Sequence, residues 1–195
     1  MTNHALVGEA LERILAGNQR WAAGESVYPN QTPDRRRELA AGQPPFAAIL
    51  GCADSRVPPE IIFDQGLGDL FIVRVAGNVL DNISLGSLEF AVQHFDIPLI
   101  IVLGHSGCGA VLAAMDDHEI QGQIATLVKA VHPALELAKE QPGGTLDRAV
   151  RSNVALVVRQ LRAAAPILAP LVEAENLKIR GAYYDQASGL VELLE

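Results

Sequence analysis

Apolar and polar residues follow two different patterns along the chain. Three short segments are almost wholly apolar and are bounded by proline, glycine or polar residues: residues 46–50, 70–75 and 99–103. Runs of this length and composition are typical of strands buried on both faces of a sheet. Two further apolar segments, residues 177–184 and 190–194, flank a turn and predict strands that pair near an edge of the sheet.

Other segments repeat apolar residues every three or four positions, which is the spacing of an amphipathic helix. The first of these runs from Val7 to Leu15, and we expect Gly17 to stop the helix. We also expect Pro133 to kink or break one of the later helices. The remaining predicted helices cover residues 33–41, 84–95, 108–115, 124–138 and 146–164.

Strands that alternate with helices predict an α/β fold with a mostly parallel central sheet flanked by helices. We expect a single domain over residues 1–195, made of an N-terminal helical arm (1–42) and an α/β core (43–195), with an edge strand region at the C-terminus. In parallel sheets, ligands collect where the strands end, so the loops after the strands are the first places to search for chemistry.

Composition excludes several classes of protein. The chain carries 15 basic and 23 acidic side chains, a net charge of −8, which argues against a nucleic-acid partner. Its apolar runs are shorter than the roughly 18 to 20 residues of a membrane span, so we expect no membrane partner. The first residues lack the pattern of a secretory signal, and we expect a cytoplasmic protein. Two cysteines are too few for a disulfide framework.

Both cysteines and one histidine fall where predicted strands end. Cys52 follows the first buried strand, and His105 and Cys108 follow the third, three residues apart across a turn into a helix. Two thiolates and one imidazole suit a catalytic zinc ion, because three protein ligands leave one tetrahedral position open. The alternative is that the cysteines are small core residues and the histidine is a hydrogen-bonded one.

The residues around these candidates resemble the β-class carbonic anhydrases. The family signatures Cys-x-Asp-x-Arg and His-x-x-Cys stand here at residues 52–56 and 105–108. Residues 56–58, 73–78 and 87–92 extend the resemblance, so that it covers most of residues 43–110. The C-terminal helices resemble the family only in length and order.

This resemblance implies zinc-dependent, reversible hydration of carbon dioxide to bicarbonate and a proton by a zinc-bound hydroxide. It implies one zinc ion per chain, held by Cys52, His105 and Cys108. Asp54 would accept a hydrogen bond from the hydroxide, and Arg56 would hold Asp54 through a bidentate pair. An ordinary surface salt bridge is the alternative for this pair.

The resemblance also implies a substrate pocket and a partner subunit. Gln43, Phe71 and Phe90 are the candidates for binding carbon dioxide or bicarbonate, in a pocket completed across a dimer interface. Phe90 stands where plant-type members have tyrosine, and both aromatic residues suit core packing as well. The N-terminal helix resembles the arm that family members wrap around a partner, so we expect a homodimer or homotetramer.

Some relatives carry a second bicarbonate site made by Trp, Arg and Tyr. Arg74 and Tyr184 match the last two residues, but Ile49 occupies the tryptophan position. We therefore expect this regulatory site to be missing and Arg74 to be a structural or interface cation.

Three other functions compete with carbon dioxide hydration. The first is hydrolysis of carbonyl sulfide or carbon disulfide by the same zinc chemistry. A phosphatase or transferase with Cys52 as nucleophile is disfavoured, because three residues separate Cys52 from Arg56 where that loop needs five. A nucleotide-binding module is disfavoured too, because Gly104, Gly107 and Gly109 do not fit the dinucleotide fingerprint.

Overall fold

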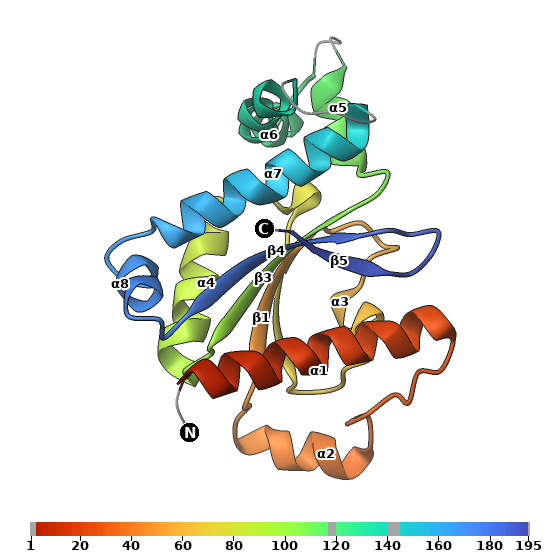
Figure 1. Ribbon diagram of the computed structural model, residues 1–195, viewed down its shortest axis with the longest axis vertical. Coiled ribbons are helices and arrows are strands. Elements are labelled where there is room, and N and C mark those ends of the chain that lie inside the picture. The colour runs from red at the N-terminus through yellow and green to blue at the C-terminus, as the bar shows by residue number, and fades with distance from the viewer. Residues whose placement is uncertain (1–2, 117–119, 140–144, 195) are drawn as a thin grey trace.

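The computed structural model describes residues 3–116, 120–139 and 145–194. Its centre is a five-stranded sheet in the order β2-β1-β3-β4-β5, in which the first four strands are parallel and β5 runs antiparallel to β4 (Figure 1). The strands are β1 (Ala47–Gly51), β2 (Leu70–Arg74), β3 (Leu99–His105), β4 (Lys178–Tyr184) and β5 (Val191–Leu194). The predicted α/β fold, with an antiparallel pair at its C-terminal edge, is confirmed.

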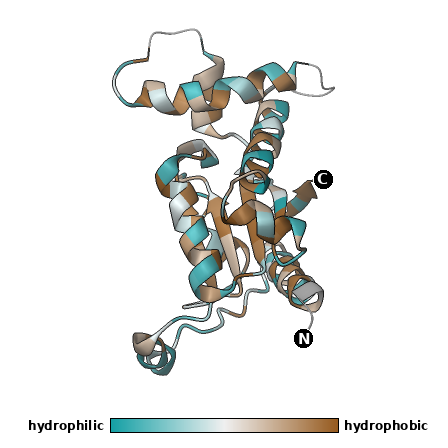
Figure 2. Cartoon of the chain, turned by 90° about the vertical axis from the view of Figure 1, so that its left-hand side faces the viewer, coloured by the Kyte–Doolittle hydropathy of each residue, from teal (hydrophilic) through white to brown (hydrophobic). Residues whose placement is uncertain are grey.

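Helices cover both faces of this sheet. They are α1 (Asn3–Ala23), α2 (Pro33–Glu38), α3 (Pro59–Ile62), α4 (Asn82–Phe95), α5 (Gly109–Met115), α6 (Ile124–Ala138), α7 (Thr145–Arg162) and α8 (Leu168–Glu173), with 3-10 turns η1 (Leu39–Ala41) and η2 (Ala76–Asn78). Successive residues of β1 and β3 point into two apolar clusters, one on each side. The helices α1, α5 and α6 pack into one cluster and α4 and α8 into the other, while α7 contributes to both. Figure 2 shows the hydrophobic strands enclosed between these helices.

The sheet differs from the sequence prediction at β2. Every residue of β1 and β3 is buried, but in β2 only Leu70 is, and Arg74 is exposed. The prediction that residues 70–75 form a strand buried on both faces is therefore wrong. The reason is position: β2 lies at the edge of the sheet, where it pairs with β1 alone.

The first helix differs as well, because α1 continues past Gly17 to Ala23. A Cβ atom on Gly17 would lie 1.8 Å from the carbonyl oxygen of Phe63, in the segment that follows α3. The prediction that Gly17 stops the helix is wrong, since the glycine marks instead a close approach between α1 and the core. Helix α6 likewise runs unbroken through Pro133. The short helices α3 and α8 have too few residues to show a helical period, and the sequence did not predict them.

The N-terminal helix is fastened to the rest of its own chain by polar contacts. Arg20 donates from Nε to the Asp64 carboxylate over 2.6 Å. Asn18 donates from Nδ2 to the Gly189 carbonyl (2.9 Å) and accepts from the Val191 amide (2.8 Å), so α1 is joined to the segment that leads into β5. Among the residues described above, no helix has the length and apolar composition needed to cross a membrane.

Candidate metal centre

The parallel strands β1 and β3 end at the same edge of the sheet, and they carry the candidate ligands there. Cys52 directly follows β1, His105 is the last residue of β3, and Cys108 caps the N-terminus of α5. All three side chains are buried, and one ligand atom from each lies within 4.8 Å of the others. The sheet thus brings Cys52 next to His105 and Cys108, which lie more than fifty positions later in the chain.

The state of His105 fits a metal ligand. Its ring is fully buried, and Nδ1 lies 2.9 Å from the Ser106 carbonyl oxygen. A carbonyl oxygen can only accept, so this contact assigns the ring proton to Nδ1. That tautomer leaves a lone pair on Nε2, which is buried and has no hydrogen-bond partner among the described residues. A buried polar atom without a partner costs about 1 to 3 kcal/mol, and a bond to zinc removes that cost. The donor set of two sulfurs and one nitrogen is also one that zinc favours.

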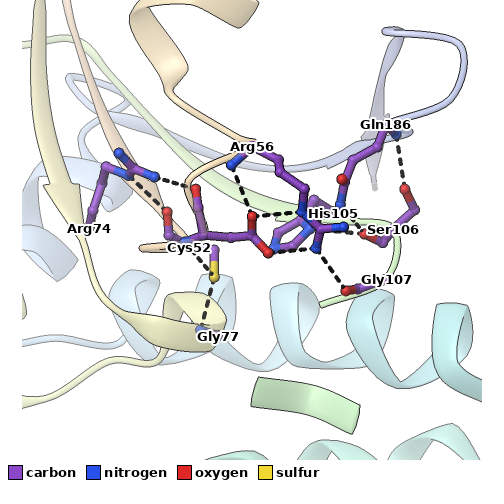
Figure 3. A network of polar contacts seen from close by, with 9 residues as sticks. Cys52, Arg56, Arg74, Gly77, His105, Ser106, Gly107 and Gln186 are labelled. Atoms are coloured by element: carbon purple, nitrogen blue, oxygen red, sulfur yellow. Dashed lines mark hydrogen bonds and ion pairs between the residues drawn. The ribbon is translucent and has the colours of Figure 1, made fainter. Parts of the chain in front are cut away.

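The two thiols form a coupled pair in which Cys52 ionises first. A hydrogen bond from the Cys108 thiol is the largest of the effects that lower the pKa of Cys52 to about 4, and burial opposes it. The Cys52 sulfur also accepts the backbone amides of Gly77 (3.2 Å) and Asp54 (3.4 Å) (Figure 3). The same shared hydrogen bond, together with burial, raises the pKa of Cys108. The contacts around Cys52 therefore favour its thiolate form over that of Cys108.

Asp54 and Arg56 form a bidentate pair beside the cluster. Arg56 donates from Nε to Oδ1 (2.9 Å) and from Nη2 to Oδ2 (2.7 Å), and its backbone amide also reaches Oδ1 (3.0 Å) (Figure 3). These hydrogen bonds hold the pKa of Asp54 well below its ordinary range. The guanidinium reaches the Gly107 carbonyl as well, at 3.3 Å, so Arg56 joins the loop after β1 to the turn after β3.

Arg74 anchors the Cys52 loop from the other side. Its guanidinium donates to the carbonyl oxygens of Cys52 (2.8 Å) and Asp54 (Figure 3). Arg74 is therefore a structural cation of this loop. Ile49 lies fully buried in the core, and the Tyr184 hydroxyl accepts a hydrogen bond from the Trp21 indole (3.2 Å).

The candidate substrate residues lie in two places. Phe71 on β2 and Phe90 on α4 are neighbours, with ring centroids 6.5 Å apart, and Phe90 also stacks on His94 at 4.9 Å. Phe90 is 52% exposed, so it is not a core residue. Gln43 follows η1 and lines a surface groove of about 700 Å³ with Leu67 and other residues. The aromatic pair and Gln43 thus occupy different elements of the chain.

Two residues that touch the ligands were missed in the sequence. Gly77 donates to the Cys52 sulfur, and the Gln186 side-chain amide lies 2.9 Å from Nδ1 of His105 and donates to the Ser106 carbonyl. A signal for Gln186 did exist: it follows β4, and a strand that pairs with β3 places its next residues beside His105. Gly77 carried a signal of the same kind, because it follows β2, and the pairing of β2 with β1 places Arg74 beside Gly51, the residue before Cys52.

Comparison with known proteins agrees with this geometry. A family model described as carbonic anhydrase matches residues 47–191. The chain is 42% identical over 188 residues to a carbonic anhydrase of Mycolicibacterium smegmatis, which covers 94% of this chain and 91% of that protein. It is also 42% identical over 184 residues to carbonic anhydrase 2 of Mycobacterium tuberculosis, with 92% and 89% covered. The chain belongs to the β-class carbonic anhydrases.

Solved structures of the same class agree with this membership. One of two tetrameric β-carbonic anhydrases from Sordaria macrospora aligns with a TM-score of 0.76 at 25% identity, over 95% of this chain and 97% of that one. A Coccomyxa β-carbonic anhydrase in complex with acetazolamide aligns with a TM-score of 0.73 at 30% identity, over 94% and 86%.

The reaction of this carbonic anhydrase is the hydration of carbon dioxide, and the family favours that reaction over hydrolysis of carbonyl sulfide or carbon disulfide. Its cluster of Cys52, His105 and Cys108 is typical of a β-class zinc site. A structural role alone for the two cysteines is therefore set aside.

Proposed function

We propose that the buried cluster of Cys52, His105 and Cys108 holds the catalytic zinc ion, and that Asp54 and Arg56 orient the water that attacks carbon dioxide. The observation that carries this proposal is the buried Nε2 of His105, which lacks a protein partner among the described residues and lies within 4.8 Å of two cysteine sulfurs. Zinc held there lowers the pKa of a water molecule and so supplies a nucleophile near neutral pH.

Asp54 acts as a hydrogen-bond acceptor for that water. Because Arg56 lowers the pKa of Asp54, the carboxylate stays ionised at neutral pH and can only accept. A hydrogen bond from the water to Asp54 leaves an oxygen lone pair of the water free to face the carbon of the substrate. The two-pronged contact from Arg56 fixes the plane of the carboxylate, which a single hydrogen bond would leave free to rotate.

The zinc assignment is tested with Cys108→Ser. Ala113→Ser is the matched control, because it adds the same hydroxyl to the same helix away from the three ligands. In the wild type and in Ala113→Ser we expect about one zinc ion per chain and rapid hydration of carbon dioxide, measured by stopped flow. In Cys108→Ser we expect both to be lost. Equal zinc content and equal activity in all three proteins would refute the assignment.

The role of the Asp54–Arg56 pair is tested with Arg56→Leu. Arg151→Leu is the control, because Arg151 also pairs with a carboxylate, Glu192, at the surface. Loss of a group that orients a first ligand or reactant typically costs about 10- to 100-fold in activity, and we expect a fall in kcat/KM of that size with zinc content unchanged. If Arg56→Leu is as active as Arg151→Leu, the pair is an ordinary surface salt bridge.

We further propose that a second copy of the chain completes the substrate pocket around Gln43, Phe71 and Phe90, in a homodimer or homotetramer. Support comes from the free edge of β2 and from large apolar side chains exposed nearby, among them Ile83 (79%) and Phe90 (52%). Sheet edges and apolar patches of this kind are generally covered. The solved Sordaria relatives are described as tetrameric, which supports the same assembly here.

In this assembly residues 1–42 form the arm that contacts the partner, and residues 43–195 form the α/β core of one domain. The proposed location is the cytoplasm, because Cys52 and Cys108 bind zinc only as reduced thiolates and reducing compartments keep them so.

A further inference from the structure

The charge on the Cys52 sulfur is shared with two backbone amides, and one of them comes from a distant loop. Gly77, in the η2 turn, donates its N–H to Sγ over 3.2 Å in a buried setting. A hydrogen bond to a thiolate withdraws electron density from the sulfur, so that the sulfur neutralises less of the charge of a bound metal ion. The orientation of this single peptide therefore bears on the metal as well as on the cysteine.

The Gly77 peptide is held in an uncommon conformation. Its φ angle is +68°, in the left-handed region, and a Cβ atom here would lie 3.1 Å from Ala110 Cβ. A glycine is free to leave this conformation, because both signs of φ are open to it. The Asn78 amide donates to the Val75 carbonyl (2.9 Å) and closes the turn, which leaves the Gly77 carbonyl to be fixed from outside it.

Asn153 on α7 supplies that restraint. Its Nδ2 donates to the Gly77 carbonyl over 2.8 Å, and the side chain is only 1% exposed. The contact joins residues 76 positions apart in the sequence. It fixes the peptide between Gly77 and Asn78, which adjoins the peptide between Ala76 and Gly77 that carries the N–H on Cys52. The chain of contacts therefore runs from Asn153 through the backbone of Gly77 to the thiolate.

Helix α7 is placed closely enough for this reach by two glycines in the sheet. A Cβ atom on Gly104 of β3 would lie 2.6 Å from Val154, and one on Gly181 of β4 would lie 2.8 Å from the same valine. Val154 is the neighbour of Asn153, so the contact that brings α7 down onto the sheet also sets the position of Asn153.

We propose that Asn153 is a positioning residue of the zinc site, which acts through the two adjoining peptides of Gly77 to orient and partly neutralise the Cys52 thiolate. This inference rests on the proposed zinc function. Asn153 touches neither metal nor substrate, and its effect is carried entirely by the peptide that it holds. Without it, the N–H of Gly77 is no longer fixed on the sulfur, and the thiolate becomes richer in electrons and less well oriented.

The test compares Asn153→Ala with Ser152→Ala. Ser152 is the matched control, because it is adjacent on α7, equally buried at 2%, and its Oγ has no hydrogen-bond partner among the described residues. Zinc affinity is measured by competition with a chromophoric chelator. The second readout is the thiolate-to-metal absorption band of protein loaded with cobalt(II) in place of zinc. Asn153→Leu is a second variant of similar volume, which loses the donor without leaving a large cavity or adding a charge.

Loss of orientation weakens zinc binding and the higher electron density of the sulfur strengthens it; we expect the loss of orientation to dominate. The zinc dissociation constant of Asn153→Ala should then rise about tenfold over that of Ser152→Ala, the lower end of the range for groups that support a metal ligand. The cobalt band should move to longer wavelength in both Asn153 variants, because an electron-rich sulfur gives up charge more easily. Equal affinities and equal spectra in Asn153→Ala and Ser152→Ala would overturn the proposal.

Two other results are also decisive. If both Asn153 variants fail to fold while Ser152→Ala folds, Asn153 is a residue of the fold and its assignment to the zinc site is wrong. A wild-type protein that binds no zinc would instead refute the proposed function, so the two failures are distinguishable.

Discussion

Substitution of Gly17 by alanine tests how closely the N-terminal helix is joined to the core. The added Cβ would lie 1.8 Å from the Phe63 carbonyl oxygen and 2.8 Å from its carbon, so the obstacle is backbone and not the end of a flexible side chain. Overpacking costs typically about 1 to 3 kcal/mol, and an immovable neighbour places this site at the upper end. Alanine gains about 0.5 to 1 kcal/mol in a helix interior, so we expect a net loss of about 2 kcal/mol.

Thermal unfolding measures this loss. In a chain of this length about 1 kcal/mol corresponds to roughly 2 to 4 °C, so the melting temperature of Gly17→Ala should fall by about 4 to 8 °C. Protein concentration and a fixed excess of zinc must be held constant, because assembly and metal binding both shift the apparent stability.

Gly8→Ala is the matched control for this experiment. Gly8 lies in the same helix, and nothing approaches its would-be Cβ within 4 Å. Here only the helix preference acts, and the melting temperature should rise by about 1 to 3 °C. If Gly17→Ala and Gly8→Ala are stabilised alike, α1 does not lie against Phe63 and the reasoning about this contact is wrong.

Two further predictions concern the same helix and the exposed aromatic pair. Asp64 is buried, which opposes its ionisation, but hydrogen bonds from Arg20 and from backbone amides outweigh burial and keep its pKa below the ordinary 3.8. The stabilisation from this ion pair is therefore present above about pH 4 and is lost as the pH falls further. In urea unfolding at pH 7, the free energy of unfolding of Arg20→Leu should be about 2 kcal/mol lower than that of the wild type, and this difference should narrow towards pH 3. A difference that does not change with pH would contradict the ion pair. Phe90→Asp should yield a smaller particle than the wild type by light scattering, with Phe90→Tyr unchanged, and an unaltered assembly in Phe90→Asp would remove Phe90 from the proposed interface.

Much of the fold was predictable from local patterns. A wholly apolar run predicted β3, and a helical spacing of apolar residues predicted α4. In both cases a few neighbouring residues are enough to indicate which side chains are buried. The ligand set was predictable for a related reason. Parallel strands end at the same edge, so Cys52 and His105 converge once both are placed after buried strands.

Other features had no local signature. Residues 70–73 are as apolar as the buried strands, and only the order of strands in the sheet makes β2 an edge. Gly17 is read as a helix end from its neighbours, whereas the reason for a glycine there is Phe63, which lies 46 positions away.

What the sequence by itself determined is the order of strands and helices, the identity of the three metal ligands and the Asp54–Arg56 pair, because each depends on neighbours or on one topological rule. The tertiary structure alone decided which groups support them. Asn153 and Gln186 reach the site across 76 and 81 positions. Contacts over such separations depend on how closely helices and turns pack on the sheet, and a pattern of apolar residues does not encode that distance.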